Sequence, residues 1–209
     1  YTTTDTLSLH DALPIFNGSP NYIVIQRLGA EGSNSGTDLQ GINGDLDNNY
    51  VLGLDIDASS TVSWNGGTGF TPIGESGTRF TGVMDGLGHS VNNLYISRSN
   101  DYQGLFGYTY GTTLRNIGVL GADITAGRNV GALVGYNAYG NIDNAWSTGR
   151  VTGIGASGGK IGGNTYVGGL VGYNYQGSIS KSFSTAHARH CGGREGLADR
   201  TLIIVTHQS

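Results

Sequence analysis

An internal repeat is the feature of this sequence that most limits its fold. Residues 130–147 read VGALVGYNAYGNIDNAWS and residues 167–184 read VGGLVGYNYQGSISKSFS; at an offset of 37 they are identical at ten of eighteen positions, without a gap. A weaker copy starts at Tyr102, where GLFGYT occupies the same frame 28 residues before the first of these segments. Such repeats indicate a solenoid, in which each unit buries its apolar side against its neighbours.

The unequal offsets predict that one structural unit accepts insertions between its strands. Solenoids place insertions in surface loops, and the insertion GIGASGGKIGGN at residues 153–164 is itself rich in glycine. A phosphate-binding loop is not expected there, because no strand leads through it into a helix and no Lys-Ser or Lys-Thr ends it. We therefore predict a flexible surface loop.

Composition excludes several fold classes. The chain has 38 glycines in 209 residues and only 12% charged residues, where about 25% is typical. Glycine destabilises helix interiors, and Asn, Ser and Thr compete with helical hydrogen bonds, so we expect an all-β protein. Three prolines and no period of three exclude collagen. Hydrophobic residues at 37%, in ordered alternation, are not typical of a disordered chain.

Each repeat consists of short alternating strands between Gly and Asn corners. A strand of three to five residues cannot bury its apolar side alone, but it gains a hydrogen-bond ladder and a continuous core when equivalent strands stack about 4.8 Å away. The sequence therefore predicts a right-handed parallel β-helix, a β-solenoid of glycine-rich repeats. The frame-matched Leu105, Leu133 and Leu170 are expected to be buried and stacked on successive or near-successive coils.

Divergent strands precede the clear repeats. Leu52, Leu54 and Ile56 alternate with Asp55 and Asp57, so the aliphatic side chains are expected on one buried face and the carboxylates on the other.

Two aromatic residues in the same upstream region are predicted to lie at a bend. Trp64 and Phe70 lie in the loop-like segment SWNGGTGFTPIG, where they are expected to cap or plug a turn of the chain.

Domain organisation follows from where the repeat pattern is present. Residues 8–15 read SLHDALPI, which resembles a translated sequencing adapter, so residues 1–16 are expected to be a non-native leader. Residues 17–186 are expected to form the solenoid, with repeats near 102–125, 130–152 and 167–186, and 187–209 to be a non-repeat, possibly artefactual tail.

The tail contains four residues of the types that bind metals, namely His187, His190, Cys191 and Glu195. A tetrahedral zinc site needs three or four N or S ligands in suitable spacing, and no second His-Cys pair is present. We predict no metal site and no cofactor, with a zinc site as the alternative.

Charge and apolar pattern limit the partners. The net charge is −4 with two lysines, so no basic face is available for nucleic acid. One cysteine permits no internal disulfide, and no apolar run approaches the ~18 residues that span a bilayer.

Two sets of residues are candidates for catalysis. Asp55 and Asp57 could hold calcium in a polysaccharide-cleaving enzyme if Arg79 or Arg98 lay close enough to act as base. Asp85 and His89 flank a turn and could form half of a dyad, although no serine in a nucleophile elbow accompanies them. A solvated strand face for the first pair, and a turn stabilised by the Asp85 side chain for the second, are the preferred interpretations, so no catalytic residue is predicted.

Tyrosines stand at one position of the repeat. Tyr108, Tyr136 and Tyr173 are expected to form a stack along the solenoid, which stabilises each pair by about 0.5–1.5 kcal/mol without any ligand. Glycan binding by an exposed aromatic ladder is the alternative. Asn137 and Asn174 are expected to form a corner ladder.

The segments GLFGYT, GALVGYN and GGLVGYN resemble the GLUG repeat of filamentous haemagglutinin-type secreted bacterial adhesins, over roughly residues 21–186. The resemblance implies a β-helical segment without catalytic function that mediates attachment at the cell surface or outer membrane. It implies host or surface glycans or matrix proteins as partners, and an outer-membrane secretion partner for a longer parent. A glycan-active β-helix enzyme and the non-catalytic repeat region of a surface peptidase remain alternatives; the peptidase motif HExxH is absent from this sequence.

Overall fold

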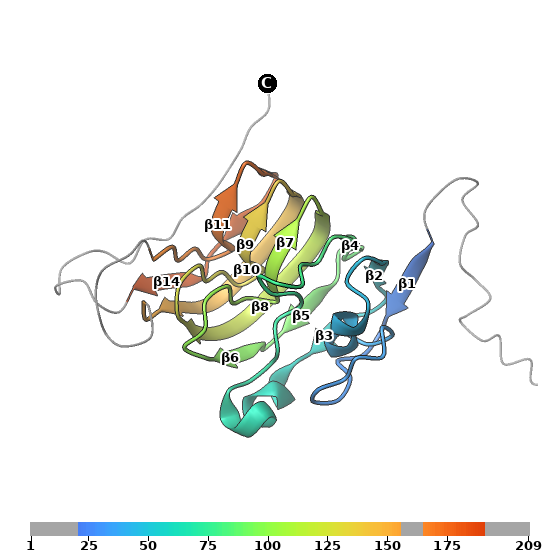
Figure 1. Cartoon of the computed structure of the whole chain (residues 1–209), viewed down its shortest axis with the longest axis horizontal. Helices are drawn as coiled ribbons and strands as arrows, with labels where there is room; N and C mark the ends of the chain where they lie inside the picture. The colour runs from blue at the N-terminus through green and yellow to red at the C-terminus, as the bar shows by residue number, and fades with distance from the viewer. Residues whose placement is uncertain (1–20, 156–164, 191–209) are drawn as a thin grey trace, which may run out of the picture.

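The protein is a parallel β-helix. The computed structural model describes residues 21–155 and 165–190, and Figure 1 shows their coils stacked along one axis. All pairs of named strands are parallel. The elements are β1 (Tyr22–Ile25), η2 (Gln40–Gly44), β2 (Asn49–Leu52), β3 (Ile56–Asp57), η3 (Ser59–Gly67), β4 (Val83–Asp85), β5 (Ser90–Asn92), β6 (Tyr95–Ser97), β7 (Phe106–Tyr110), β8 (Thr113–Ala126), β9 (Val134–Ala138), β10 (Asn141–Gly153), β11 (Val171–Tyr175), β12 (Ser178–Ser180), β13 (Phe183–Ser184) and β14 (His187–His190).

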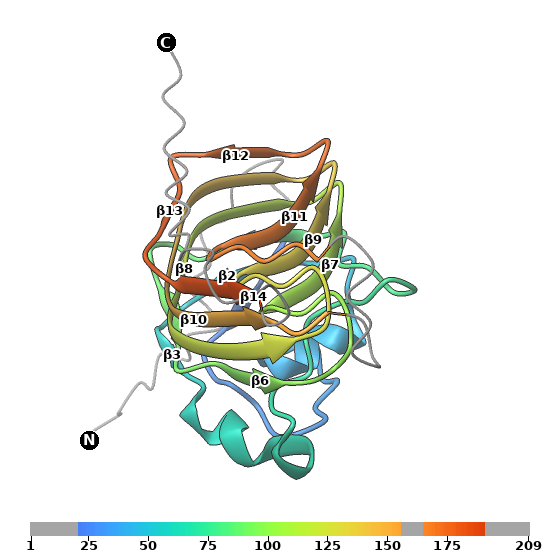
Figure 2. The same ribbon diagram turned by 90° about the vertical axis from the view of Figure 1, so that its left-hand side faces the viewer.

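Strand register confirms the repeat offsets. One wall of the solenoid follows the order β1-β2-β4-β8-β10-β12. Thr113 pairs with Asn141, and Asn141 pairs with Ser178, which are the offsets of 28 and 37 found in the sequence. A separate sheet, β11-β9-β7, forms another wall (Figure 2).

The long strands turn corners where the backbone enters the left-handed region. In β8 the corner residues are Asn116 (φ 52°) and Gly121 (φ 63°), and in β10 they are Asn144 (φ 52°) and Gly149 (φ 118°). Asn and Gly adopt this conformation more easily than other residues. Each long strand therefore wraps around the core and supplies more than one wall of its coil.

The core is a set of ladders that run from coil to coil. Leu105 and Leu133 are fully buried and Leu170 is 4% exposed. The amide of Phe106 donates to the oxygen of Leu133 at 2.8 Å, and the amide of Leu133 donates to the oxygen of Leu170 at 2.9 Å. The prediction that these leucines are buried on successive coils is confirmed.

The repeat glycines stand where two backbones approach closely. A Cβ atom at Gly135 would lie 2.6 Å from the amide nitrogen of Gln103, and one at Gly172 would lie 2.5 Å from that of Val130. Neither contact can be relieved by moving a flexible side chain. The glycine that both repeat copies carry before the Tyr-Asn pair is therefore required by packing between the strand and the chain segment of the neighbouring coil.

One expectation for the upstream strands was wrong. Leu54 is 52% exposed rather than buried with Leu52 and Ile56, because β2 ends at Leu52 and the chain bends before β3, which interrupts the alternation. Trp64 and Phe70 are 8% and 0% exposed and belong to the core, with ring centroids 6.4 Å apart. The amide of Phe70 donates to the oxygen of Tyr95, which draws this segment against the solenoid.

The strand ladder continues beyond Ala186, where the sequence pattern stops. Residues His187 to His190 form β14, which pairs with Arg150 to Gly153 of β10. Pairing at this position depends on backbone groups, so it does not require the repeat's side-chain pattern. The expected leader at 1–16, most of the loop at 153–164, Cys191 and Glu195 lie outside the described residues.

Candidate functional site

The predicted tyrosine stack lies on the outer side of sheet β11-β9-β7. The rings of Tyr108 and Tyr136 are stacked with centroids 4.6 Å apart and planes 19° apart. Tyr136 and Tyr173 follow at 5.1 Å. The three side chains are half-buried, so each ring packs against its neighbours and keeps one part in contact with solvent.

A second row of tyrosines runs beside the first and was not predicted. Tyr110 and Tyr139 have centroids 5.4 Å apart, and Tyr139 and Tyr175 are 5.3 Å apart. The three side chains are 42%, 46% and 38% exposed. Tyr110 and Tyr175 occupy the same position of the repeat, where both pair with Ala138 of the middle coil. The middle coil supplies its tyrosine one residue later, from Tyr139 at the corner, whose φ is 56°. The sequence signal for this row is the tyrosine that directly follows Ala138, one residue after the repeat position held by tyrosine in the other two copies.

Further aromatic groups extend this surface at its edge. The Tyr102 ring lies 5.5 Å from Tyr108 and 5.6 Å from Tyr136, and the Tyr166 ring lies 4.5 Å from Tyr173. We call the eight residues together the tyrosine face: Tyr102, Tyr108, Tyr110, Tyr136, Tyr139, Tyr166, Tyr173 and Tyr175. The guanidinium of Arg79 lies 5.3 Å from the Tyr108 ring centroid and 5.1 Å from that of Tyr110, within cation–π range.

The hydroxyls of Tyr136 and Tyr139 stay protonated at physiological pH, because both pKa values are raised. Burial, and then the neighbouring phenols, raise the pKa of Tyr136 to about 12. The hydrogen bond with Tyr175 raises the pKa of Tyr139. The face therefore offers apolar rings together with phenol hydroxyls, which suit a ligand with both apolar surfaces and hydroxyl groups.

An asparagine ladder, buried at Asn137 and exposed at Asn174, runs through the same strands as the tyrosine rows. The Nδ2 of Asn137 donates to Oδ1 of Asn174 at 2.7 Å and to the oxygen of Gly140 at 3.0 Å. The hydroxyl of Thr109 donates to Oδ1 of Asn137 at 2.8 Å. The predicted corner ladder is confirmed, and it fixes the ends of the strands that carry the tyrosines.

The first carboxylate pair faces solvent and forms no ion pair with a lysine or arginine of the described residues. Oδ1 of Asp55 accepts the amide of Ser90 at 2.8 Å and lies 3.3 Å from Nδ1 of His89, and the amide of Ser90 and then His89 lower its pKa. Asp57 accepts the amide of Ser59, which lowers its pKa. Neither Arg79 nor Arg98 lies at this pair, because Arg79 covers tyrosine rings and Arg98 donates to the oxygen of Gly69.

The structure separates the second candidate pair. Oδ2 of Asp85 accepts Nε of Arg115 at 2.7 Å, and Oδ1 accepts the amide of Leu87 at 2.9 Å, whereas His89 pairs with Asp55. Burial alone would raise the pKa of Asp85, but bonds from Asn116, Leu87 and Arg115 lower it. Asp85 therefore stabilises its turn, as predicted, and is not the partner of His89.

Acid should weaken the fold through Asp85. A depressed carboxyl pKa contributes stability above the unfolded value, about 3.9, and the contribution is lost as pH falls through the lower native value. We expect Asp85→Asn to reduce the unfolding free energy by about 1–2 kcal/mol at pH 7 and to flatten its dependence on pH below 4. Denaturant titrations at several pH values measure this. The exposed Asp123→Asn serves as control, and an unchanged pH dependence in the Asp85 variant would contradict the assignment.

The described residues contain no group of three or more His, Cys, Asp or Glu side chains that could hold a metal ion. His187 and His190 lie at the two ends of β14. In the same parts of the chain, no helix is long and apolar enough to cross a membrane.

Comparison with known proteins agrees with the repeat architecture. The model of the GLUG motif matches residues 126–152 and 163–188. Over 114 residues the chain is 45% identical to Halomucin of Haloquadratum walsbyi, which covers 51% of this chain and 1% of that protein. Over 100 residues it is 40% identical to a protein of Evansella cellulosilytica named as a Gly-rich membrane protein. This match covers 46% of this chain and 11% of that protein. The chain thus spans only a small part of the length of these relatives.

A solved structure shares the fold. The crystal structure of a Bacteroides ovatus protein named as an immunoglobulin A1 protease superimposes with a TM-score of 0.58 at 20% identity, over 83% of this chain and 49% of that one. At this identity the likeness concerns the fold alone. Register, core and motif matches together establish that the chain is a parallel β-helix with a GLUG-repeat region at residues 126–152 and 163–188.

Proposed function

We propose that this chain is a structural and binding segment of a secreted or cell-surface adhesin, and that it attaches to glycans or matrix proteins through the tyrosine face. The observation that carries the proposal is the exposure of a second tyrosine row, at 38–46%, above a stack that already stabilises the sheet. The similarity to relatives named Halomucin and a Gly-rich membrane protein supports a secreted or cell-surface location.

The fold suits repeated weak contacts. Successive coils present equivalent side chains at a spacing of about 4.8 Å, so one extended ligand can contact several coils at once. Individually weak contacts then add through effective concentration. Association with the bacterial outer membrane, and a secretion partner there for a longer parent, are further parts of this proposal that rest on the resemblance to filamentous haemagglutinin-type adhesins.

Removing the outer tyrosine row should weaken attachment without unfolding the protein. We expect the double variant Tyr139→Ala and Tyr175→Ala to bind about tenfold more weakly to immobilised mucin or fibronectin, because two exposed aromatic contacts of about 0.5–1.5 kcal/mol each are lost. Surface plasmon resonance measures the binding.

A matched control tests whether the effect is specific to this face. Leu54→Ala and Val62→Ala remove side chains that are 52% and 56% exposed elsewhere on the surface, and binding should not change. Equal binding by the tyrosine variant and the parent, or no binding to either surface, would count against the proposal.

No catalytic turnover is expected. Within the described residues, no lysine or arginine forms an ion pair with Asp55 or Asp57, so the base that a calcium-dependent lyase would need beside this pair is missing. A calcium-dependent lyase assay on polygalacturonate should therefore give no unsaturated product. Turnover that Asp55→Asn abolishes would replace the adhesin proposal with a glycan-active enzyme.

A further inference from the structure

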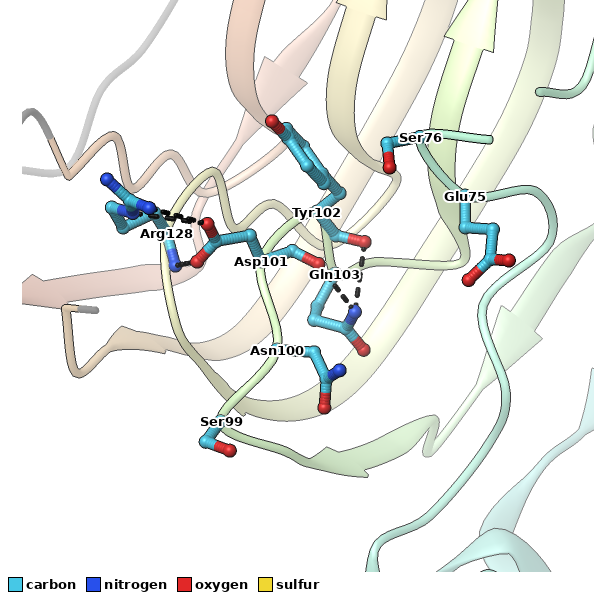
Figure 3. Close-up of a pocket in the computed structure, with 8 residues that line it drawn as sticks. All are labelled: Glu75, Ser76, Ser99, Asn100, Asp101, Tyr102, Gln103 and Arg128. Carbon is cyan, nitrogen blue, oxygen red and sulfur yellow. Dashed lines mark hydrogen bonds and ion pairs between the residues drawn. The ribbon is translucent and has the colours of Figure 1, made fainter. Parts of the chain in front are cut away.

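A polar cavity of about 480 Å³ opens beside the tyrosine face. It lies between the loop at Glu75 and Ser76 and the segment from Ser99 to Gln103 (Figure 3). Its volume falls within the range of about 300–1,000 Å³ that is usual for small-ligand sites. The residues around it are mostly polar, so a ligand would be held by hydrogen bonds.

Gln103 lines this cavity, and its buried amide oxygen has no hydrogen-bond partner among the described residues. The residue is 7% exposed, and its Nε2 donates to the backbone oxygens of Asp101 at 2.8 Å and Tyr102 at 3.1 Å. Because both partners can only accept, they determine which end of the amide is nitrogen. The Oε1 atom is buried and has no hydrogen-bond partner among the described residues. A buried amide oxygen in this state favours a ligand that donates a hydrogen bond.

The charges around the cavity favour an uncharged donor. Arg128 is committed to Asp101: its amide and Nε donate to the carboxylate at 2.8 and 3.1 Å, as Figure 3 shows. Glu75 adds an exposed carboxylate that forms no ion pair with any described residue. Anionic groups would therefore be repelled, whereas hydroxyl groups can donate to Gln103 and Glu75.

Tyr102 joins the cavity to the tyrosine face. Its backbone oxygen accepts from Gln103 inside the cavity, and its ring contacts Tyr108 and Tyr136 outside it. A chain molecule with one unit in the cavity would thus continue across aromatic rings. Pyranose sugars match both parts, because their hydroxyls donate hydrogen bonds around the ring edge and their C–H faces pack on aromatic rings.

We propose that this cavity binds one neutral pyranose residue of a polysaccharide whose chain extends over the tyrosine face. The inference rests on the proposed attachment function and names its ligand class and its second contact region. Glu75, Asn100 and Gln103 select hydroxyl-rich neutral sugars, and the tyrosines hold the neighbouring units.

Isothermal titration of the full chain tests the proposal with four neutral hexaoses (cellohexaose, maltohexaose, mannohexaose and hexa-N-acetylchitohexaose) and with hexagalacturonate as the charged probe. At least one neutral hexaose should bind, and hexagalacturonate should bind at least tenfold more weakly. Asn100→Ala and Gln103→Leu should each weaken binding of the neutral hexaose about tenfold. Glu75→Lys should reduce the ratio between the affinities for the neutral hexaose and for hexagalacturonate. If Gln103→Leu lowers the thermal unfolding midpoint, its weaker binding no longer reports on the cavity alone. The variants at the exposed Asn100 and Glu75 then test the cavity site.

The outcomes separate this inference from the attachment function. Neutral-hexaose binding that only the Tyr139 and Tyr175 variant weakens would overturn the cavity site and leave attachment through the tyrosine face intact. Stronger binding of hexagalacturonate, or no binding of any neutral hexaose, would also overturn the cavity site. Binding to immobilised mucin or fibronectin would still test the attachment function independently.

Discussion

Leu133→Asp is expected to unfold the central coils and to lower the unfolding free energy by more than about 4 kcal/mol. Leu133 is fully buried, and its backbone bonds both neighbouring coils, since it donates to Leu170 and accepts from Phe106. A carboxylate there would have no charged partner, and the loss would spread because solenoid stability is a sum of unit and nearest-neighbour terms. Guanidinium titration followed by circular dichroism measures the change.

The chain offers a control with the same chemical change. Leu54→Asp introduces the same carboxylate at a leucine that is 52% exposed, and it should alter stability by no more than about 0.5 kcal/mol. Similar losses in both variants would show that Leu133 is not part of a continuous core, and the repeat assignment would then be wrong.

Gly135→Ala should cost about 2 kcal/mol although it adds only one methyl group. The new Cβ would lie 2.6 Å from the amide nitrogen of Gln103, and backbone atoms on two coils would have to separate. The same displacement would disturb the segment that forms the proposed sugar cavity, so hexaose binding should weaken together with stability. Thermal melts and titrations of one sample measure both.

Gly77→Ala is the matched control, because no atom lies within 4 Å of its Cβ position and its φ is not in the left-handed region. This variant should be neutral or slightly stabilised, since alanine reduces the freedom of the unfolded chain. A Gly135 variant as stable as the Gly77 variant would contradict the packing account of the repeat glycine.

These expectations connect the repeat to the proposed function. The glycines bring the coils close together and the asparagine ladder fixes the strand ends, so the tyrosine rings are held at short and regular spacing before any ligand arrives. A surface that is already ordered loses little conformational freedom on binding. The same contacts that stabilise the solenoid therefore prepare it for attachment.

The repeat alone determined much of the clear solenoid. Offsets of 28 and 37 predicted the strand register, and the frame predicted the burial of Leu133, the stack at Tyr136 and the ladder at Asn137. This succeeded because stacked coils place residues of equal frame in equal surroundings. The GLUG resemblance depends on the same periodic positions, and the fold class followed from them together with the glycine content.

Only the tertiary structure decided the contacts that break the frame. The bend after β2 exposes Leu54. Between Asp85 and Ser90 the chain has two more residues than the paired segment of β8, and this separates Asp85 from His89. Asp85 pairs with Arg115 instead, and His89 lies beside Asp55. Tyr139 entered the outer row from a corner, and Gln103 faces a cavity between loops of different coils. These positions depend on loop lengths and on pairing between distant segments, which no local pattern of apolar and polar residues records.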